Sequence, residues 1–325
     1  MQLPRRTFLQ CAAGAATLAA APRVARAEAY PARPVRMIVP FAPGGGTDLC
    51  AHLMAEWLAQ RLGQQFLVIN RTGAGSNVGT DSVVKAAPDG YTLLAFDPSA
   101  AINATLYDNL DFVFVRDIAA VALIVRTPIL MVVHPSVPAT TVPEFIAYAK
   151  ANPGKINMSS GGIGTTPHVC GELFKMMAGV ALTHVPYRGS GPARVDLLAG
   201  QVQVMFDPIA QSIGFVKSGQ LRALAVTSAQ RADVLPDVPT IGEFVPGYAA
   251  DTWYGIGAPR DTPVEIVDKL NREINAGLAD PRLTARMADL GGTVATASPA
   301  DFARLLVDET EKWGKVVKFS GAKAE

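Results

Sequence analysis

The segment VRMIVPFAPGGGTDLCAHLMAEWLAQRL, residues 35–62, holds the pattern that decides the fold. It begins with a short apolar run of strand length that stops at Pro40. Three consecutive glycines follow, and the residues after them are apolar at helical spacing up to Gly63, a residue type common at helix ends. The pattern predicts a strand at 35–39, a glycine junction, and a helix over 48–62 with one apolar face, formed by Leu49, Leu53, Trp57, Leu58 and Leu62.

Strands and helices alternate in the same way along the rest of the chain. A second glycine loop, GAGSNVG at 73–79, follows the next apolar run and leads into another helix. Thr141, Thr262 and Ser298 have the residue type and position of helix caps, and Thr141 with Glu144 forms a capping-box pattern. The further strands are expected at 66–69, 91–96, 130–134, 156–160, 182–185, 202–206, 221–226 and 253–258.

This alternation indicates an α/β protein whose sheets are mostly parallel and flanked by helices. A chain of 325 residues is longer than a single core usually supports, so two domains are expected. The C-terminal part has too few strands for a third sheet and is expected to pack back on the first domain. We therefore expect a first lobe made of residues 28–127 and 250–325, and an inserted second lobe made of residues 128–249.

The first 27 residues have the features of a cleavable export signal, and they predict a periplasmic protein. Arg5 and Arg6 precede an Ala-rich apolar stretch that is too short to span a bilayer. Ala25-Arg26-Ala27 then supplies the small residues that signal peptidase requires. The sequence RRTFL at 5–9 favours the twin-arginine route, with ordinary Sec export as the alternative.

Removal of this signal takes four arginines with it and changes the formal net charge from +1 to −3. A mildly acidic chain lacks the basic surface that DNA or RNA binding requires, so no nucleic-acid partner is expected. Two cysteines remain, Cys50 and Cys170, and an oxidising compartment permits a disulfide between them. Packing as small apolar side chains is favoured for both over a reactive thiol.

Two glycine junctions resemble each other. GGGTDLC at 44–50 joins a strand to a helix, and GIGTTPHVC at 162–170 does the same in the second lobe. Glycine lets a backbone approach a ligand closely, and a helix N-terminus offers unpaired N–H groups and partial positive charge. Ligands of open α/β sheets lie beyond the carboxyl ends of the strands. One such loop is more often only a tight turn. These two junctions and the loop at 73–79 make three on an exported chain, and together they favour a clamp for a small carboxylate.

A dinucleotide-dependent enzyme is the strongest competing interpretation. The loop at 73–79 follows a strand and Asp97 ends the next strand, but the glycines are spaced G-x-G-x-x-x-G rather than G-x-G-x-x-G. The sequence has no P-loop, no H-E-x-x-H pair and no G-x-S-x-G motif, so no metal, cofactor or catalytic residue is expected. His168, in the first turn of the helix expected at 167–178, either reaches the cleft or has a core or capping role.

Seven motifs occur in a specific order across essentially the whole mature chain. They are PFAPGGGTD at 40–48, GAGSNVG at 73–79, APDGYTL at 87–93, SSGGIGT at 159–165, HVPYRG at 184–189, DLLAG at 196–200 and WYG at 253–255. This order resembles the Bug family, the extracytoplasmic solute receptors of tripartite tricarboxylate transporters. The resemblance implies a receptor, not an enzyme, with a Venus flytrap fold of two α/β lobes joined by two crossing strands. Its partners would be membrane transporter subunits or a sensor, and we expect a monomer.

The resemblance also implies where the ligand lies. One carboxylate of a small organic acid would be held by backbone groups and bridging waters from the two glycine loops of the first lobe, and the second lobe would contact the rest. Carried over to the matching positions, the ligand-binding residues are Phe41, Pro43, Gly44, Gly45, Thr47, Asp48, Gly75, Ser76, Asn77, Asp97, Ser99, Ser160, Gly164, Thr165, His168, Tyr187 and Asp207.

Asp97 departs from the small residues that are common after this strand in the family. Together with Asp207 it places two acidic residues near the expected cleft. Carboxylates repel a second anionic group on a ligand. This pair favours a monocarboxylate, or a ligand with a cationic group, over citrate-like polyanions.

Overall fold

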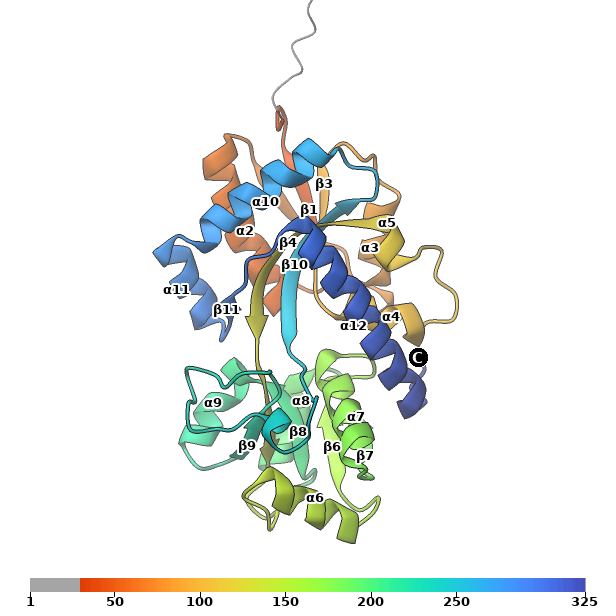
Figure 1. Ribbon diagram of the computed structural model, residues 1–325, viewed down its shortest axis with the longest axis vertical. Coiled ribbons are helices and arrows are strands. Elements are labelled where there is room, and N and C mark those ends of the chain that lie inside the picture. The colour runs from red at the N-terminus through yellow and green to blue at the C-terminus, as the bar shows by residue number, and fades with distance from the viewer. Residues whose placement is uncertain (1–29, 325) are drawn as a thin grey trace, which may run out of the picture. The chain divides into compact units, whose positions relative to one another are not determined.

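The computed structural model describes residues 30–324, and its helices and strands lie in one compact unit, Arg33–Glu325. The predicted signal, residues 1–27, lies outside the described residues. A six-stranded and a five-stranded sheet organise this unit (Figure 1). We call the six-stranded sheet with the helices on it the first lobe, and the five-stranded sheet with its helices the second lobe.

The first sheet has the strand order β11-β4-β10-β3-β1-β2. Its strands are β1 (Val35–Val39), β2 (Phe66–Asn70), β3 (Thr92–Phe96), β4 (Ile118–Thr127), β10 (Thr252–Pro259) and β11 (Thr293–Val294). The helices of this lobe are α2 (Gly46–Leu62), η1 (Ala74–Ser76), α3 (Asn77–Val84), α4 (Ser99–Leu106), α5 (Phe114–Asp117), α10 (Val264–Leu278) and α11 (Pro281–Asp289). Strand β1 pairs in parallel with β2 and β3, and the other pairings are antiparallel.

The second sheet has the order β7-β6-β8-β5-β9. Its strands are β5 (Ile129–Val133), β6 (Asn157–Ser160), β7 (Thr183–Pro186), β8 (Val204–Pro208) and β9 (Arg222–Val226). Its helices are α6 (Val142–Ala151), α7 (Thr166–Ala178), α8 (Ser190–Leu198), α9 (Ile209–Lys217) and η2 (Ile241–Glu243). Strand β6 pairs in parallel with β7 and β8, whereas β5 is antiparallel to β8 and β9.

Two strands carry the chain between the lobes, and they explain why both sheets are mixed. Strand β4 passes through Pro128 directly into β5, and β10 returns to the first sheet, where it pairs antiparallel with β3 and β4. The two-lobed α/β fold with crossing strands is confirmed. The parallel pairings are confined to the strand–loop–helix units that contain the glycine loops, and the crossing strands add the antiparallel ones.

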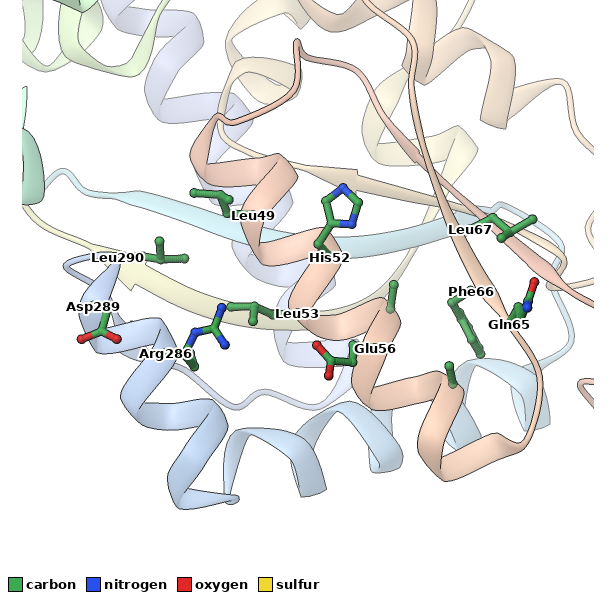
Figure 2. A pocket seen from close by; sticks show the side chains of 12 residues that line it. Leu49, His52, Leu53, Glu56, Gln65, Phe66, Leu67, Arg286, Asp289 and Leu290 are labelled. Atoms are coloured by element: carbon green, nitrogen blue, oxygen red, sulfur yellow. The ribbon is translucent and has the colours of Figure 1, made fainter.

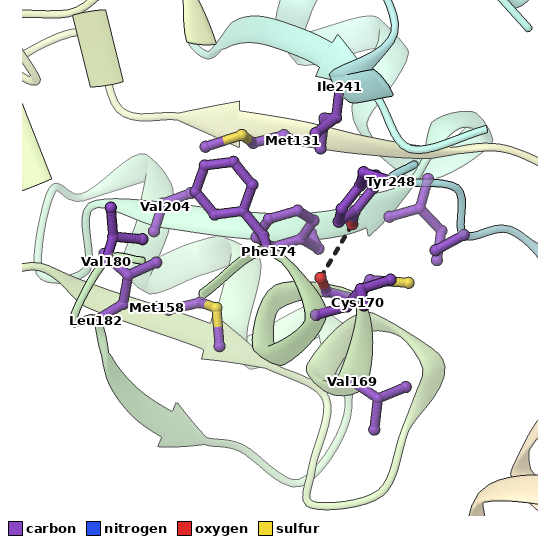
Figure 3. Close-up of a cluster of buried hydrophobic side chains, with 14 of the residues drawn as sticks. Met131, Met158, Val169, Cys170, Phe174, Val180, Leu182, Val204, Ile241 and Tyr248 are labelled. Carbon is purple, nitrogen blue, oxygen red and sulfur yellow. Dashed lines mark hydrogen bonds between the residues drawn. The ribbon is translucent and has the colours of Figure 1, made fainter. Parts of the chain in front are cut away.

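Phe174 on α7 occupies the centre of the second lobe's core. Its ring lies 6.0 Å from that of Phe206 and 6.4 Å from that of Tyr248 between ring centroids. The Tyr248 hydroxyl donates to the Cys170 carbonyl at 3.0 Å, which ties the loop before β10 to α7 (Figure 3).

Cys50 and Cys170 are both free and buried. Burial raises the pKa of Cys50 to about 12 and also raises that of Cys170. Both side chains therefore pack as small apolar groups, as predicted, and they form no disulfide.

Helix caps follow the sequence in two of three places. Ser298 and Thr141 accept hydrogen bonds from the N–H groups three residues later, at Asp301 and Glu144. The Glu144 carboxylate, however, accepts from the Thr140 N–H group, one residue before the expected partner. Thr262 is not a cap: its hydroxyl donates to the Pro259 carbonyl at 2.7 Å, and the helix starts at Val264.

The apolar face predicted for α2 overlaps its buried face only at Leu58, and Leu49 is 40% exposed. Cys50, Ala51 and Ala55 let the helix approach the sheet closely, whereas the Trp57 indole turns towards α10 and donates to the Glu273 carbonyl at 2.7 Å. The buried residues are Thr47, Asp48, Cys50, Ala51, Met54, Ala55 and Leu58.

The C-terminal helix α12 (Pro299–Ser320) packs on both lobes. Phe302 and Leu306 belong to a core cluster of the first lobe, whereas Trp313 lies in the cluster that fills the second lobe. Figure 1 shows the helix running from the first sheet towards α7. The indoles of Trp253 on β10 and Trp313 both donate to the buried Glu309 carboxylate, at 3.2 and 2.8 Å. Helix α12 is therefore a third connection between the lobes.

Replacing Trp313 by Ala should lower the free energy of unfolding by about 3–5 kcal/mol, because a fully buried indole and its hydrogen bond are lost. Phe319→Ala on the same helix is the matched control, since that ring is 52% exposed, and it should change the value by only about 0.5 kcal/mol. Urea unfolding of both variants measures the difference. Similar losses in the two would contradict the placement of Trp313 in the core.

Candidate functional site

Three loops of the first lobe meet at one edge of its sheet. Strands β1, β2 and β3 are neighbours and run parallel, so their carboxyl ends lie together. The loops that leave these ends contain residues 44–47, residues 73–77 and Asp97. Helices α2 and α3 begin directly after the first two loops, and neither has a side-chain cap on its first N–H groups. At α3 the N–H groups of Asn77 and Val78 donate to the Ala74 and Gly73 carbonyls, so it is the start of α2 that offers backbone donors at this edge.

The second loop is held by Asn103 of α4. Its Nδ2 group donates to the Gly75 carbonyl at 2.6 Å and to the Asn77 Oδ1 atom at 3.1 Å. A carbonyl can only accept, so the Gly75 contact fixes the Asn103 amide, and Asn103 in turn fixes the Asn77 amide. The Asn77 Nδ2 donor points away from Asn103, is buried, and has no partner among residues 30–324. A buried donor without an acceptor costs about 1–3 kcal/mol.

The backbone of this loop is strained. Gly73, Ala74, Gly75 and Ser76 all have positive φ, with values of 136°, 45°, 61° and 94°. Such values suit glycine but cost an alanine or serine roughly 1–3 kcal/mol each. Strain of this kind persists where surrounding contacts impose it, and Asn103 supplies such contacts here.

Hydrogen bonds to the buried Asp48 carboxylate hold the first loop in place. This carboxylate accepts from the Gly44 N–H group at 2.9 Å and from Asn70 Nδ2 at 2.7 Å, while Asn70 also donates to the Phe41 carbonyl at 3.0 Å. Burial alone would raise the pKa of Asp48, but these hydrogen bonds outweigh it and lower the pKa. Asp48 therefore shapes the loop, and Pro43, Gly44 and Gly45 form its exposed tip.

Asp97 lies beside the first loop rather than alone in the cleft. Its carboxylate accepts from the Ser99 N–H group at 2.9 Å and from the Thr47 hydroxyl at 3.4 Å. Burial raises the pKa of Asp97, and these two hydrogen bonds offset only part of the effect.

Two stacked histidines support the glycine loop of the second lobe. The rings of His168 and His184 are 3.9 Å apart. His168 Nδ1 accepts from the Gly164 N–H group at 3.2 Å, and His184 Nε2 lies 2.7 Å from the Ser160 hydroxyl, which contacts the Gly162 carbonyl at 3.1 Å. The core role of His168 is the one that the structure shows, because only 2% of the residue is exposed.

Thr165 caps α7 with its hydroxyl, which also donates to the Gly162 carbonyl at 2.8 Å. Asp207 is fully buried and forms an ion pair with Arg194, whose Nε lies 2.7 Å from its carboxylate. Ser212 donates to the same carboxylate. Asp207 therefore carries no uncompensated charge that would repel a second anionic group, contrary to the expectation from the sequence.

One cavity of about 410 Å³ is lined by residues from both lobes. Gly75 and Tyr107 come from the first lobe, and Gly162 and Tyr187 come from the second. Gly164 lies so close to α4 that a Cβ atom there would sit 2.3 Å from Leu106 Cδ2, so glycine is needed for this contact. The structure thus brings the second loop of the first lobe to the glycine loop of the second lobe.

Comparison with known proteins agrees with this geometry. Residues 50–321 match the family model described as the tripartite tricarboxylate transporter family receptor. The chain belongs to this family. Protein BugT of Bordetella pertussis is 38% identical to it over 300 residues, which cover 91% of this chain and 92% of BugT.

Two solved structures are also similar. The Rpa4515 protein of R. palustris, solved with adipate, is 38% identical to this chain, with a TM-score of 0.78. The match covers 90% of this chain and 98% of the Rpa4515 chain. MatC of Rhodopseudomonas palustris, with bound malate, is 33% identical to this chain, with a TM-score of 0.75. The match covers 89% of this chain and 100% of the MatC chain.

Family membership decides between the two main interpretations of the glycine loops. The family consists of solute-binding receptors, so the chain is a receptor, and a nucleotide-dependent enzyme is not favoured. Within residues 30–324, no group of three or more His, Cys, Asp or Glu side chains is placed to hold a metal ion. No helix in the same range is long and apolar enough to cross a membrane.

A second cavity, of about 540 Å³, lies on the outer side of the first lobe between α2, β2 and α11 (Figure 2). Leu49, His52 and Leu53 line it from α2, and Leu290 lines it from the end of α11. None of the residues of the glycine loops at 44–47, 73–77 and 161–165 contributes to its lining, so it is separate from those loops.

Sequence reasoning missed several residues of the site. Asn103 lies in the apolar segment AAINATL, where a lone Asn among apolar residues was the available signal. Arg194, which neutralises Asp207, has no local signal, because the two residues meet only through the packing of α8 on β8. His184 and Arg188 belong to the HVPYRG motif but were not assigned to the site.

The stacked histidines should make the receptor less stable in acid. Burial, aided by neighbouring positive charge, lowers the pKa of His168 from 6.5 to about 3 and that of His184 to about 4. The unfolded chain therefore binds protons that the folded chain does not, and the free energy of unfolding should fall as the pH drops from 6.5 towards 4.

His168→Asn keeps an acceptor for the Gly164 N–H group but removes one titrating ring. Its free energy of unfolding should therefore decline less than that of the wild type over the same pH range. Urea titrations at a series of pH values compare the two proteins. Parallel declines would show that His168 is not one of the groups responsible.

Proposed function

We propose that this receptor binds a small organic carboxylate in the cleft between its lobes and presents it to the membrane subunits of a tripartite tricarboxylate-type transporter. One carboxylate group is held by the first-lobe loops at residues 44–47 and 75–77. The buried Asn77 Nδ2 donor carries this proposal, because a carboxylate oxygen is the acceptor that it lacks. The positive ends of the helix dipoles at the starts of α2 and α3 favour the same negative charge.

The relatives support an acid as the ligand, since the two similar solved structures contain adipate and malate. The second lobe contributes its glycine loop, which the histidine pair and Ser160 hold in place.

We assign residues 28–127 and 250–325 to the first lobe and 128–249 to the second, with α12 packing on both. The receptor acts in the periplasm as a monomer, and residues 1–27 are its cleavable export signal.

Asn77→Asp tests the proposal with a nearly isosteric change. A carboxylate in place of the amide removes the free donor and repels the bound acid, so affinity for adipate or malate should fall about 10- to 100-fold. Isothermal titration calorimetry of the mature chain measures this loss.

Asn152→Asp is the matched control. Its Nδ2 group donates to the Tyr148 carbonyl at 3.0 Å at the end of α6, so the variant makes the same amide-to-carboxylate change in the second lobe, away from the loops of the site. It should bind as the wild type does. Unchanged affinity in the Asn77 variant would remove Asn77 from the site.

A further inference from the structure

The cavity between the lobes has one charged side chain in its lining. Its walls are formed by apolar residues, glycines and two tyrosines, with the guanidinium of Arg188 as the exception. The lining residues are Gly75, Leu106, Tyr107, Gly162, Ile163, Pro186, Tyr187, Arg188 and Ala324. The lining therefore carries a net positive charge, on the wall that faces the Gly75 loop.

The backbone around Arg188 is fixed against the second-lobe glycine loop. The Tyr187 N–H group donates to the Ser160 carbonyl and the Gly189 N–H group donates to the Gly161 carbonyl, both at 3.0 Å. Gly189 then turns the chain with a φ of 108° into α8. The backbone of Arg188 is thus fixed at the cavity by hydrogen bonds on both sides, which sets the position from which its side chain reaches the cavity.

The guanidinium of Arg188 is available. No carboxylate of residues 30–324 forms an ion pair with it, whereas Arg194, six residues further on, is occupied by Asp207 and Gln211. Tyr187 is likewise occupied, because its hydroxyl donates to Asp196 at 2.6 Å. Arg188 is therefore the polar side chain of this wall that remains open to a ligand.

The acidic residues near the cleft do not oppose an anion in this cavity. Asp207 is neutralised by Arg194, and Asp97 lies next to Thr47 and Ser99 and is not part of the lining. A planar guanidinium can bind both oxygens of a carboxylate at once, which gives direction as well as charge.

Resting on the proposed function, we infer that Arg188 binds a second anionic group of the ligand, so that the receptor selects dicarboxylates over monocarboxylates of equal chain length. The first carboxylate lies at Asn77 and the start of α3. The carbon chain spans the apolar part of the cavity, between Leu106 and Ile163. The second carboxylate then faces the Arg188 guanidinium.

Matched acid pairs test this inference: succinate with butyrate, adipate with hexanoate, and suberate with octanoate. Each is titrated calorimetrically into the mature wild type, Arg188→Gln and Arg188→Lys. Arg188→Gln should weaken the best diacid about tenfold and leave its monoacid partner within about twofold. The diacid affinity of Arg188→Lys should lie between those of the wild type and Arg188→Gln, because lysine keeps the positive charge but cannot bind both carboxylate oxygens at once. Arg282→Gln, on an arginine whose side chain is 86% exposed on α11, is the control and should leave both affinities unchanged.

The outcomes separate the inference from the function on which it rests. Equal weakening of diacids and monoacids by Arg188→Gln, or no weakening of either, overturns the role of Arg188 and leaves the carboxylate receptor intact. Tighter binding of monoacids than of diacids by the wild type also overturns it. If no acid of either kind binds the wild type, the proposed function fails and the inference fails with it.

Discussion

The site depends on the hydrogen bonds that Asn103 makes from α4 to the loop before α3. They reach Gly75 and Ser76, two of four consecutive residues at positive φ, and they fix the orientation of the Asn77 amide. The resulting conformation is costly for the free chain, because Ser76 is strained and the Asn77 donor is unpaired. An acid that accepts from this donor recovers part of the cost. Because the loop already exposes this donor, little further ordering is needed for an acid to bind there.

The rest of the fold brings a second wall to this loop. In the second lobe, the parallel strands β6, β7 and β8 end at one edge, just as β1, β2 and β3 do in the first. The stacked histidines hold the glycine loop at that edge, and the contact of Gly164 with Leu106 brings it against α4. Helix α12 packs on both lobes and so ties the two walls of the cavity together.

The sequence predicts best what depends on local residues. Strand–loop–helix units, the glycine junctions and the Ser298 cap follow from short patterns whose physical causes act within a few residues. The buried face of α2 does not follow, because close packing on the sheet selects Cys50 and Ala51 over the larger Leu49. Ion pairs between residues of different elements cannot be predicted from the sequence either. The sequence presents Asp207 as a free acid, but the packing of α8 places Arg194 against it, and this removes one of the two reasons for expecting a single carboxylate.

A crystal structure of the mature chain with bound adipate tests the central claim most directly. The account predicts one carboxylate oxygen within hydrogen-bond distance of Asn77 Nδ2, with the first turns of α2 and α3 around it and the second lobe closed over the acid. An acid bound in the cavity between α2, β2 and α11 would contradict it. So would an acid bound between the lobes while Asn77 Nδ2 stays unpaired.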